Sequence, residues 1–295
     1  MEENSRVIRS FKTQVGDWVF VIICVLISLM CILPMINLLA RSLSGTDYLV
    51  RHEVYLWPKG WNIDAYKTVL TDMKYIRAFI WTVVLTIMCT LLSLVMTTIC
   101  AYPLIFENLR GRGVINIVIT ITMFFSAGTI PNYLLMKSLN LLDNPLVLMV
   151  PYCLSVYNMI IMRSFFYGIP DSLRESAEID GASYFRILIS IYLPLSKPVL
   201  ATLALFYAVG RWNGYSDALM YMKDKNYYPL QLLLYNILNN INSVEVATQE
   251  GFSAPGLKDS LKSAIVMFST IPILCIYPSL QKYFIHGVTL GAVKE

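Results

Sequence analysis

Six long apolar runs separated by polar links constrain this chain more than any other feature. Each run has about the 20 residues that a helix needs to cross the hydrocarbon core of a bilayer. Backbone polar groups inside a bilayer must be hydrogen-bonded within the protein, which favours helices. The composition agrees, with 57% hydrophobic and only 14% charged residues. The sequence therefore predicts an all-α, polytopic membrane protein with six transmembrane helices.

The spans are expected at about residues 17–40, 78–105, 114–136, 145–167, 195–219 and 263–283. Together they form a single transmembrane domain over residues 1–295. The first run is too long for a signal peptide and lacks a small-x-small cleavage site, so a retained span is expected. Gly128 and Pro131 are expected to bend or break the third span near its far end. The two longer polar links, residues 41–77 and 220–262, are expected to be loops.

An even number of spans places both termini on one side of the membrane. Lysines and arginines divide equally between the two sides, so their totals do not set the orientation. The positive-inside rule applies best to short links, and the link at residues 107–113 contains Arg110 and Arg112. This link favours a cytoplasmic location for its side.

A polar helix is expected between the fourth and fifth spans, at Asp171–Asp180. Proline and an acid suit its first turn, and Gly181 suits the left-handed residue that ends a helix. Arg174 and Glu178 are four residues apart and can pair, in the weaker orientation. Such a helix has about three turns and is too short to be stable alone in water, so it needs a partner surface. An amphipathic helix lying on the membrane surface is the alternative.

The same segment carries a spaced motif: Glu-Ser-Ala, three residues, Gly, nine residues, Ile-x-Leu-Pro. It resembles the EAA signature of ABC importer permeases, with serine in place of one alanine. The resemblance covers the whole chain in span count and loop lengths. Arg211-Trp212-Asn213 and Pro229-Leu230-Gln231 are similar to the carbohydrate-importer branch, the maltose-type permeases, and particularly to its oligosaccharide members.

The resemblance implies a permease subunit of an ATP-driven importer of a sugar or oligosaccharide. In that family the EAA helix is a coupling helix that docks in a cleft of the cytoplasmic ATPase. The implied coupling residues are Glu175, Ser176, Ala177, Asp180, Gly181, Leu193 and Pro194. Pro194 and Pro198 would bound a stiff joint that passes force to the fifth span.

The implied location is the bacterial inner (cytoplasmic) membrane, crossed several times, with both termini cytoplasmic. The implied partners are a second permease subunit of different sequence, an ATPase dimer, an extracytoplasmic solute-binding protein, the sugar and membrane lipid. The link at residues 220–262 would lie outside and contact the binding protein, or serve as a solvated connection.

Candidate residues for the substrate path lie in the fourth and fifth spans. Arginine within a span is costly and faces protein or water. An amide can bond sugar hydroxyls, and an indole face can pack on a sugar ring. The candidates are Arg211, Trp212, Asn213, Tyr157 and Asn158. For Arg211 and Trp212 the alternative is an anchoring role at the outer membrane interface.

Other classes of protein find little support in the sequence. No phosphate-binding G-x-x-x-x-G-K-[ST] motif occurs, so the chain cannot hydrolyse ATP by itself. The resemblance implies that ATP and magnesium bind a separate ATPase chain and that this chain has no cofactor. A membrane enzyme would need a catalytic cluster, and two isolated histidines without an acidic pair argue against it. Two distant histidines and six cysteines without a CxxC predict no metal site. No basic run suggests nucleic-acid binding. An ion-coupled secondary transporter, the alternative class, would need paired carboxylates deep in its spans.

Overall fold

The computed structural model describes residues 11–240 and 255–292, and these residues form helices without a β-strand. A single bridge pairs Ser44 with Trp61. The prediction of an all-α chain is confirmed. The chain forms two compact units, one of residues 1–71 and 240–268 and the other of residues 72–239 and 269–295.

The first unit contains a long apolar helix followed by short ones. Its elements are α1 (Phe11–Ser42), α2 (Thr46–Val50), α3 (Asp64–Thr71) and the start of α15 (Pro255–Ala292). No part of the most apolar stretch of α1, within Asp17–Ser42, is buried inside the chain. At the end of α1, Arg41 forms a 2.7 Å ion pair with Asp259 of α15. Within the first unit, the apolar surface of α1 is therefore left uncovered by the other described helices.

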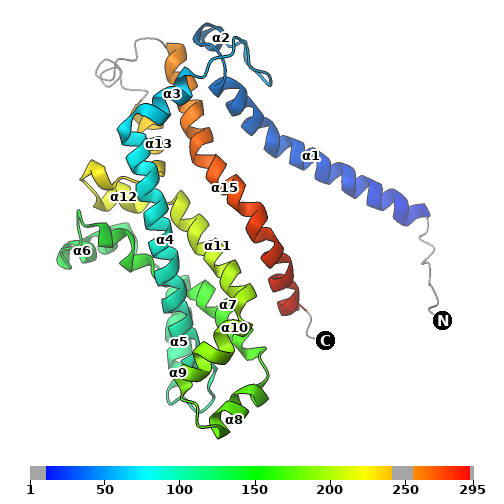
Figure 1. Cartoon of the computed structure of the whole chain (residues 1–295), viewed down its shortest axis with the longest axis vertical. Coiled ribbons are helices and arrows are strands. Elements are labelled where there is room, and N and C mark those ends of the chain that lie inside the picture. Colours follow the sequence, from blue (N-terminus) through cyan, green and yellow to red (C-terminus); the bar gives the residue numbers. More distant parts are fainter. Residues whose placement is uncertain (1–10, 241–254, 293–295) are drawn as a thin grey trace. The chain divides into compact units, whose positions relative to one another are not determined.

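The second unit is built around α4 and α11, which pack along each other (Figure 1). Its elements are α4 (Met73–Ala101), η1 (Pro103–Ile105), α5 (Arg112–Phe124), α6 (Thr129–Ser138), η2 (Pro145–Leu148), η3 (Val150–Tyr152), α7 (Val156–Tyr167), α8 (Asp171–Ile179), α9 (Tyr184–Ile187), the π-helix η4 (Leu188–Tyr192), α10 (Leu193–Leu195), α11 (Lys197–Asn213), α12 (Ser216–Tyr221), η5 (Lys225–Tyr227) and α13 (Leu230–Asn240).

Small and weakly polar residues allow this close packing. The buried face of α4 repeats every three to four residues and includes Ala78, Thr82, Cys89, Ser93 and Thr97. Small side chains let helix backbones approach in a membrane, where the hydrophobic effect does not drive association. The Thr97 hydroxyl lies 2.7 Å from the Tyr207 hydroxyl of α11. The α4–α11 interface is thus held by packing and by hydroxyl contacts.

Three helices of the described chain are long and apolar enough to cross a membrane, and three bent pairs bring the number of candidate spans to six. The long helices lie at Asp17–Ser42, Met73–Ile105 and Lys258–Ile276. The pairs are Arg112–Phe124 with Thr129–Ser138, bent by 116°, Pro145–Tyr152 with Val156–Tyr167, bent by 45°, and Tyr184–Leu195 with Lys197–Asn213, bent by 82°.

The expected break in the third span is present, at Gly128. This glycine has φ +89°, in the range that favours glycine, and precedes α6. Pro131 lies in the first turn of α6, where proline is tolerated because the amides there have no partner within the helix. The bend therefore comes from the extended backbone before α6, and Pro131 only helps to start the new helix.

Two expectations about later parts of the chain are wrong. The fifth helix does not continue to residue 219, because α11 ends at Asn213 and Gly214 is extended. The link at residues 220–262 is not a plain loop, since it contains α13 and the first turns of α15. Apolar residues of α13, such as Leu232, are buried in the second unit. Their burial explains why this stretch forms a helix, although the polar character of the link predicted a loop. Residues 241–254 of this link lie outside the described residues.

Candidate functional site

The helix α8 has a well-defined end. It starts after Pro170, with Asp171 in its first turn. At its end the Gly181 amide donates to the Glu178 carbonyl (3.0 Å) and the Ala182 amide to the Ala177 carbonyl (2.9 Å). These two bonds form a Schellman motif around Gly181, whose φ is +76°. The helix ends at Ile179, within one residue of the expected bound.

The surface of α8 is almost entirely free. None of its residues is buried, and Glu175, Ser176, Asp180 and Gly181 are exposed, while Ala177 is half-buried. Ile179 is 87% exposed. A short helix with this much uncovered surface is marginal by itself. The structure thus presents α8 as a surface available for a partner.

Arg174 is the one cation of α8 and is held by two carboxylates. It pairs with Asp171 at 3.2 Å and with Glu178 at 3.1 Å, as the sequence predicted for Glu178. Burial is the largest single effect on the pKa of Arg174 and lowers it, but hydrogen bonds and charge attraction from both carboxylates together raise this pKa above its ordinary value. The guanidinium is therefore a fixed positive charge.

The chain after α8 reaches α11 through a sharp bend. Leu193 and Pro194, two predicted coupling residues, belong to α10 and follow the π-helix η4. The bend of 82° lies between Leu195 and Lys197, at the buried residue Ser196. Pro194 is exposed and lies before the bend. The expected stiff proline joint is therefore a bend at Ser196.

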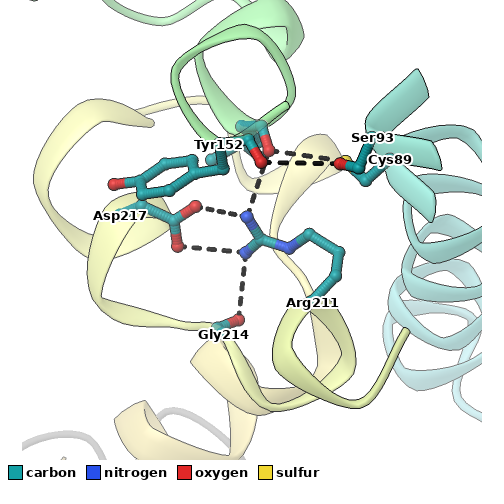
Figure 2. A network of polar contacts seen from close by, with 7 residues as sticks. Cys89, Ser93, Tyr152, Arg211, Gly214 and Asp217 are labelled. Atoms are coloured by element: carbon teal, nitrogen blue, oxygen red, sulfur yellow. Dashed lines mark hydrogen bonds and ion pairs between the residues drawn. The ribbon is translucent and has the colours of Figure 1, made fainter. Parts of the chain in front are cut away.

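The second notable region is a polar network where the fourth span breaks (Figure 2). The segment Pro145–Tyr152 is 3-10 helical. Some of its carbonyls therefore lack the backbone partners that a regular α-helix would give them. Two side chains of α4 contact these carbonyls: Cys89 Sγ lies 3.6 Å from the Leu148 oxygen and Ser93 Oγ lies 3.5 Å from the Tyr152 oxygen. Irregular backbone at membrane depth is tolerated when protein groups satisfy it in this way.

Arg211 connects this segment to the end of α11. Its guanidinium donates to both carboxylate oxygens of Asp217, at 2.5 and 3.0 Å. It also donates to the Leu148 carbonyl (3.1 Å) and the Gly214 carbonyl (3.3 Å). Both charged side chains are at most 7% exposed. The pair neutralises itself, so the network is polar but carries no net charge.

A cavity of about 410 Å³ lies beside this network. Its lining residues are Cys89, Ser93, Pro151, Tyr152, Leu154, Ser155, Asn158, Phe206, Tyr207, Gly210, Arg211, Gly214, Ser216 and Asp217. The volume falls within the range of small-molecule sites. The wall mixes hydroxyl, amide and carbonyl groups with three aromatic residues, so it can bond a neutral, hydroxylated ligand.

The five candidates for the substrate path separate into three groups. Arg211 and the buried Asn158 line the cavity. Trp212 does not: its indole is buried, donates to the Ser269 carbonyl at 3.1 Å and packs edge-on against Phe79. Tyr157 and Asn213 are exposed, away from the cavity lining. An anchoring role at the interface is wrong for both Arg211 and Trp212, because both are buried within the second unit.

Asp217 was not predicted from the sequence as the partner of Arg211. The signal in the sequence was an acid six residues after an arginine in an apolar context. Ser93 and Tyr207 were not predicted either, because their roles depend on the break in the fourth span. Within the described residues, no group of three or more histidine, cysteine or acidic side chains is placed to hold a metal ion.

These features define a class of protein: a helical, multi-pass membrane protein with broken spans and an exposed polar helix before the α11 span. The chain belongs to the family of binding-protein-dependent transport system inner membrane components, whose sequence profile matches residues 10–290. It is therefore a permease subunit of an ABC transporter. In this family the ATPase is a separate chain, and the permease is not an enzyme. The alternative of an ion-coupled secondary transporter is set aside.

Two curated relatives come from Bacillus subtilis (strain 168). Protein LplC is 38% identical over 265 residues, which cover 89% of each chain. The polygalacturonan/rhamnogalacturonan transport system permease protein YtcP is 36% identical over 285 residues, covering 96% of this chain and 99% of the relative.

A solved structure is also similar over nearly the full length. It is a chain of a bacterial ABC transporter involved in the import of the acidic polysaccharide alginate. The two chains are 32% identical with a TM-score of 0.87, over 94% of this chain and 99% of that chain.

Proposed function

We propose that this chain moves an oligosaccharide delivered by an extracytoplasmic binding protein. Support comes from the relatives, whose names concern polygalacturonan/rhamnogalacturonan transport and alginate import. The observation that carries the substrate class is the cavity of about 410 Å³ with its hydroxyl and amide lining. Sugars offer many hydroxyl groups, and buried polar groups of a site favour ligands that bond them.

Within the cavity, Asn158 and Tyr207 contact sugar hydroxyls. Both side chains line it from facing helices, α7 and α11. Arg211 and Asp217 form a neutral part of the wall. Tyr157 and Asn213, both exposed, line the pore shared with a second permease subunit of different sequence. Trp212 is a packing residue of this path and does not touch the sugar.

ATP hydrolysis is coupled to movement of this path through α8. In this proposal α8 docks on an ATPase dimer at the cytoplasmic face of the bacterial inner membrane, and both termini lie on that side. The uncovered surface of α8, including Glu175 and Ile179, supports a docking role. Movement of the ATPase then displaces α8 and rocks the spans between inward and outward access.

The substrate path is tested by filling the cavity. Gly210 lines the cavity, and nothing lies within 4 Å of a Cβ added there, so Gly210→Leu starts its side chain in open space. We expect uptake of labelled oligogalacturonides or alginate oligosaccharides by the reconstituted transporter to fall about tenfold or more, while the ATPase remains bound. Gly113→Leu is the matched control, because its added Cβ also meets open space. Unchanged uptake by Gly210→Leu would remove the cavity from the path.

The docking role is tested by Glu175→Lys, which reverses an exposed charge on α8. We expect the ATPase to dissociate from the variant permease during purification, with normal insertion of the permease in the membrane. Glu53→Lys, a charge reversal in the first unit, serves as control. Retention of the ATPase by Glu175→Lys together with normal uptake would contradict the docking role.

A further inference from the structure

We propose that four aromatic side chains, Tyr102, Phe106, Phe166 and Tyr192, carry the movement of α8 directly to α4 and α7. This set is called the aromatic cluster below. The inference rests on the proposed docking of α8 to the ATPase and concerns what happens after docking. It assigns these residues a positioning role in transport.

The route begins where α8 touches the rest of the second unit. The guanidinium carbon of Arg174 lies 5.6 Å from the centre of the Phe106 ring, over its face. Asp171 and Glu178 hold Arg174 in this position from within α8. A cation over a ring face is attracted by the ring quadrupole. A displacement of α8 therefore pulls or pushes on Phe106.

Phe106 passes this displacement to the end of α4. Its ring makes edge contacts with Tyr102, at 5.1 Å between centroids, and with Tyr184, at 5.2 Å. The Tyr102 hydroxyl donates to the Tyr184 carbonyl at 3.0 Å. Tyr102 directly follows the last residue of α4. The start of α9 and the end of α4 are thus joined to the same ring.

Inside the unit, Tyr102 meets rings from two further elements. Its centroid lies 5.2 Å from that of Tyr192 in η4 and 6.3 Å from that of Phe166 in α7. Phe166 and Tyr192 contact each other at 5.3 Å. All three rings are at most 6% exposed. Close-packed interiors transmit displacement because they have no space to absorb it.

The covalent route from α8 to α11 is less suited to this task. It passes through the π-helix η4 and the 82° bend at Ser196. A sharp bend between helices can serve as a hinge, where backbone dihedrals change when the flanking helices move. The aromatic cluster reaches α4 without crossing the bend, and α7 precedes α8 in the chain with only residues 168–170 between them. The geometry therefore assigns the cluster the transmission of movement to α4 and the coupling of this movement to α7.

The test uses the complete transporter, with the second permease, the ATPase and the sugar-loaded binding protein. Phe106→Leu removes the ring and keeps an apolar side chain. We expect the ATPase to remain bound and basal hydrolysis to persist, while uptake and the stimulation of hydrolysis by the loaded binding protein fall about fivefold or more. Phe106→Tyr keeps the ring and restores both. Phe20→Leu, on the exposed face of α1, is the matched control.

Other outcomes are distinguishable. Loss of the ATPase from Phe106→Leu would make Phe106 part of the docking surface and overturn transmission. A lowered melting temperature with hydrolysis and uptake falling in parallel would assign the cluster a packing role only, and would also overturn it. Stimulation and uptake within twofold of the parent would do the same. Failure of the docking proposal itself appears separately, as retention of the ATPase by Glu175→Lys with normal uptake.

Discussion

At the scale of residues, the second unit depends on one buried ion pair. Arg211 donates hydrogen bonds to Asp217 and to two backbone carbonyls, while its buried Nε has no hydrogen-bond partner. Removing one partner of a buried pair leaves an uncompensated charge, whereas replacing both by apolar residues is much less costly. The pair is therefore a structural requirement of the cavity wall as well as part of it.

We expect Asp217→Leu to destabilise the second unit by about 3–5 kcal/mol, because the Arg211 charge stays buried without a carboxylate. The double variant Arg211→Leu, Asp217→Leu should recover a large part of this loss. The melting temperature of the purified permease complex in detergent measures both effects. A double variant less stable than the single one would contradict the assignment of the cost to an unpaired charge.

Gly181 is the other residue whose identity the structure requires, because of its backbone conformation. Its φ of +76° strains any residue with a Cβ, although no atom lies within 4 Å of that Cβ. Gly181→Ala should cost about 1–2 kcal/mol at the end of α8 through backbone conformation alone. Faster hydrogen exchange of the Gly181 and Ala182 amides would report it. Gly113→Ala, without a positive φ, should have no such effect, and equal exchange in both variants would be evidence against backbone strain.

At the scale of elements, the helices differ in how far the sequence predicts them. Long apolar runs predict α1 and α4 because span length is a local property. The end of α8 is predictable from Gly181, since glycine favours the left-handed conformation. The break between η3 and α7 is not predictable in this way. It is possible only because side chains of α4 and α11, distant in sequence, satisfy its carbonyls.

A similar long-range contact fixes the turn before η2. The Asp143 carboxylate accepts hydrogen bonds from the Lys223 and Asp224 amides, at 2.8 and 2.9 Å. These backbone bonds are the main cause that lowers the pKa of Asp143 below its ordinary 3.8. The stabilisation is therefore complete above pH 3.8 and is lost as the pH falls through the lower folded-state pKa.

We expect the melting temperature of the parent to exceed that of Asp143→Asn at pH 7. The difference should shrink below pH 3.8, where the parent carboxylate becomes protonated. Thermal unfolding of both proteins from pH 7 to pH 3 provides the measurement. A difference that stays constant over this range would show that the charge of Asp143 is irrelevant to the turn.

At the scale of the whole molecule, the permease class was predictable because it depends on a spaced local motif and on span number. The cavity was not, since its walls combine residues from α4, η3, α7 and α11. Arg211 was identified as unusual from its place in an apolar run. Its role became clear only with Asp217, which the extended Gly214 brings back toward it.

The proposed orientation in the membrane leads to a further prediction. The exposed residue Ser172 lies in α8, beyond the end of α4, whereas η5 lies at the start of α4, where Arg77 contacts Asn226. We expect a membrane-impermeant maleimide to label Lys225→Cys in intact cells, and Ser172→Cys only after permeabilisation. The parent, which keeps its six native cysteines, sets the background. The reverse pattern would mean that α8 faces outward.

The capped carbonyls of the fourth span also have a consequence for biogenesis. The Leu148 carbonyl is bonded by Arg211, which is synthesised 63 residues later. Until α11 leaves the ribosome, only side chains of α4, which are made earlier, are in place to bond the carbonyls of the 3-10 segment before α7. The fourth span therefore lacks one of its native hydrogen bonds when it is first made. We expect its final packing in the bilayer to be completed only after α11, a later span, has been synthesised.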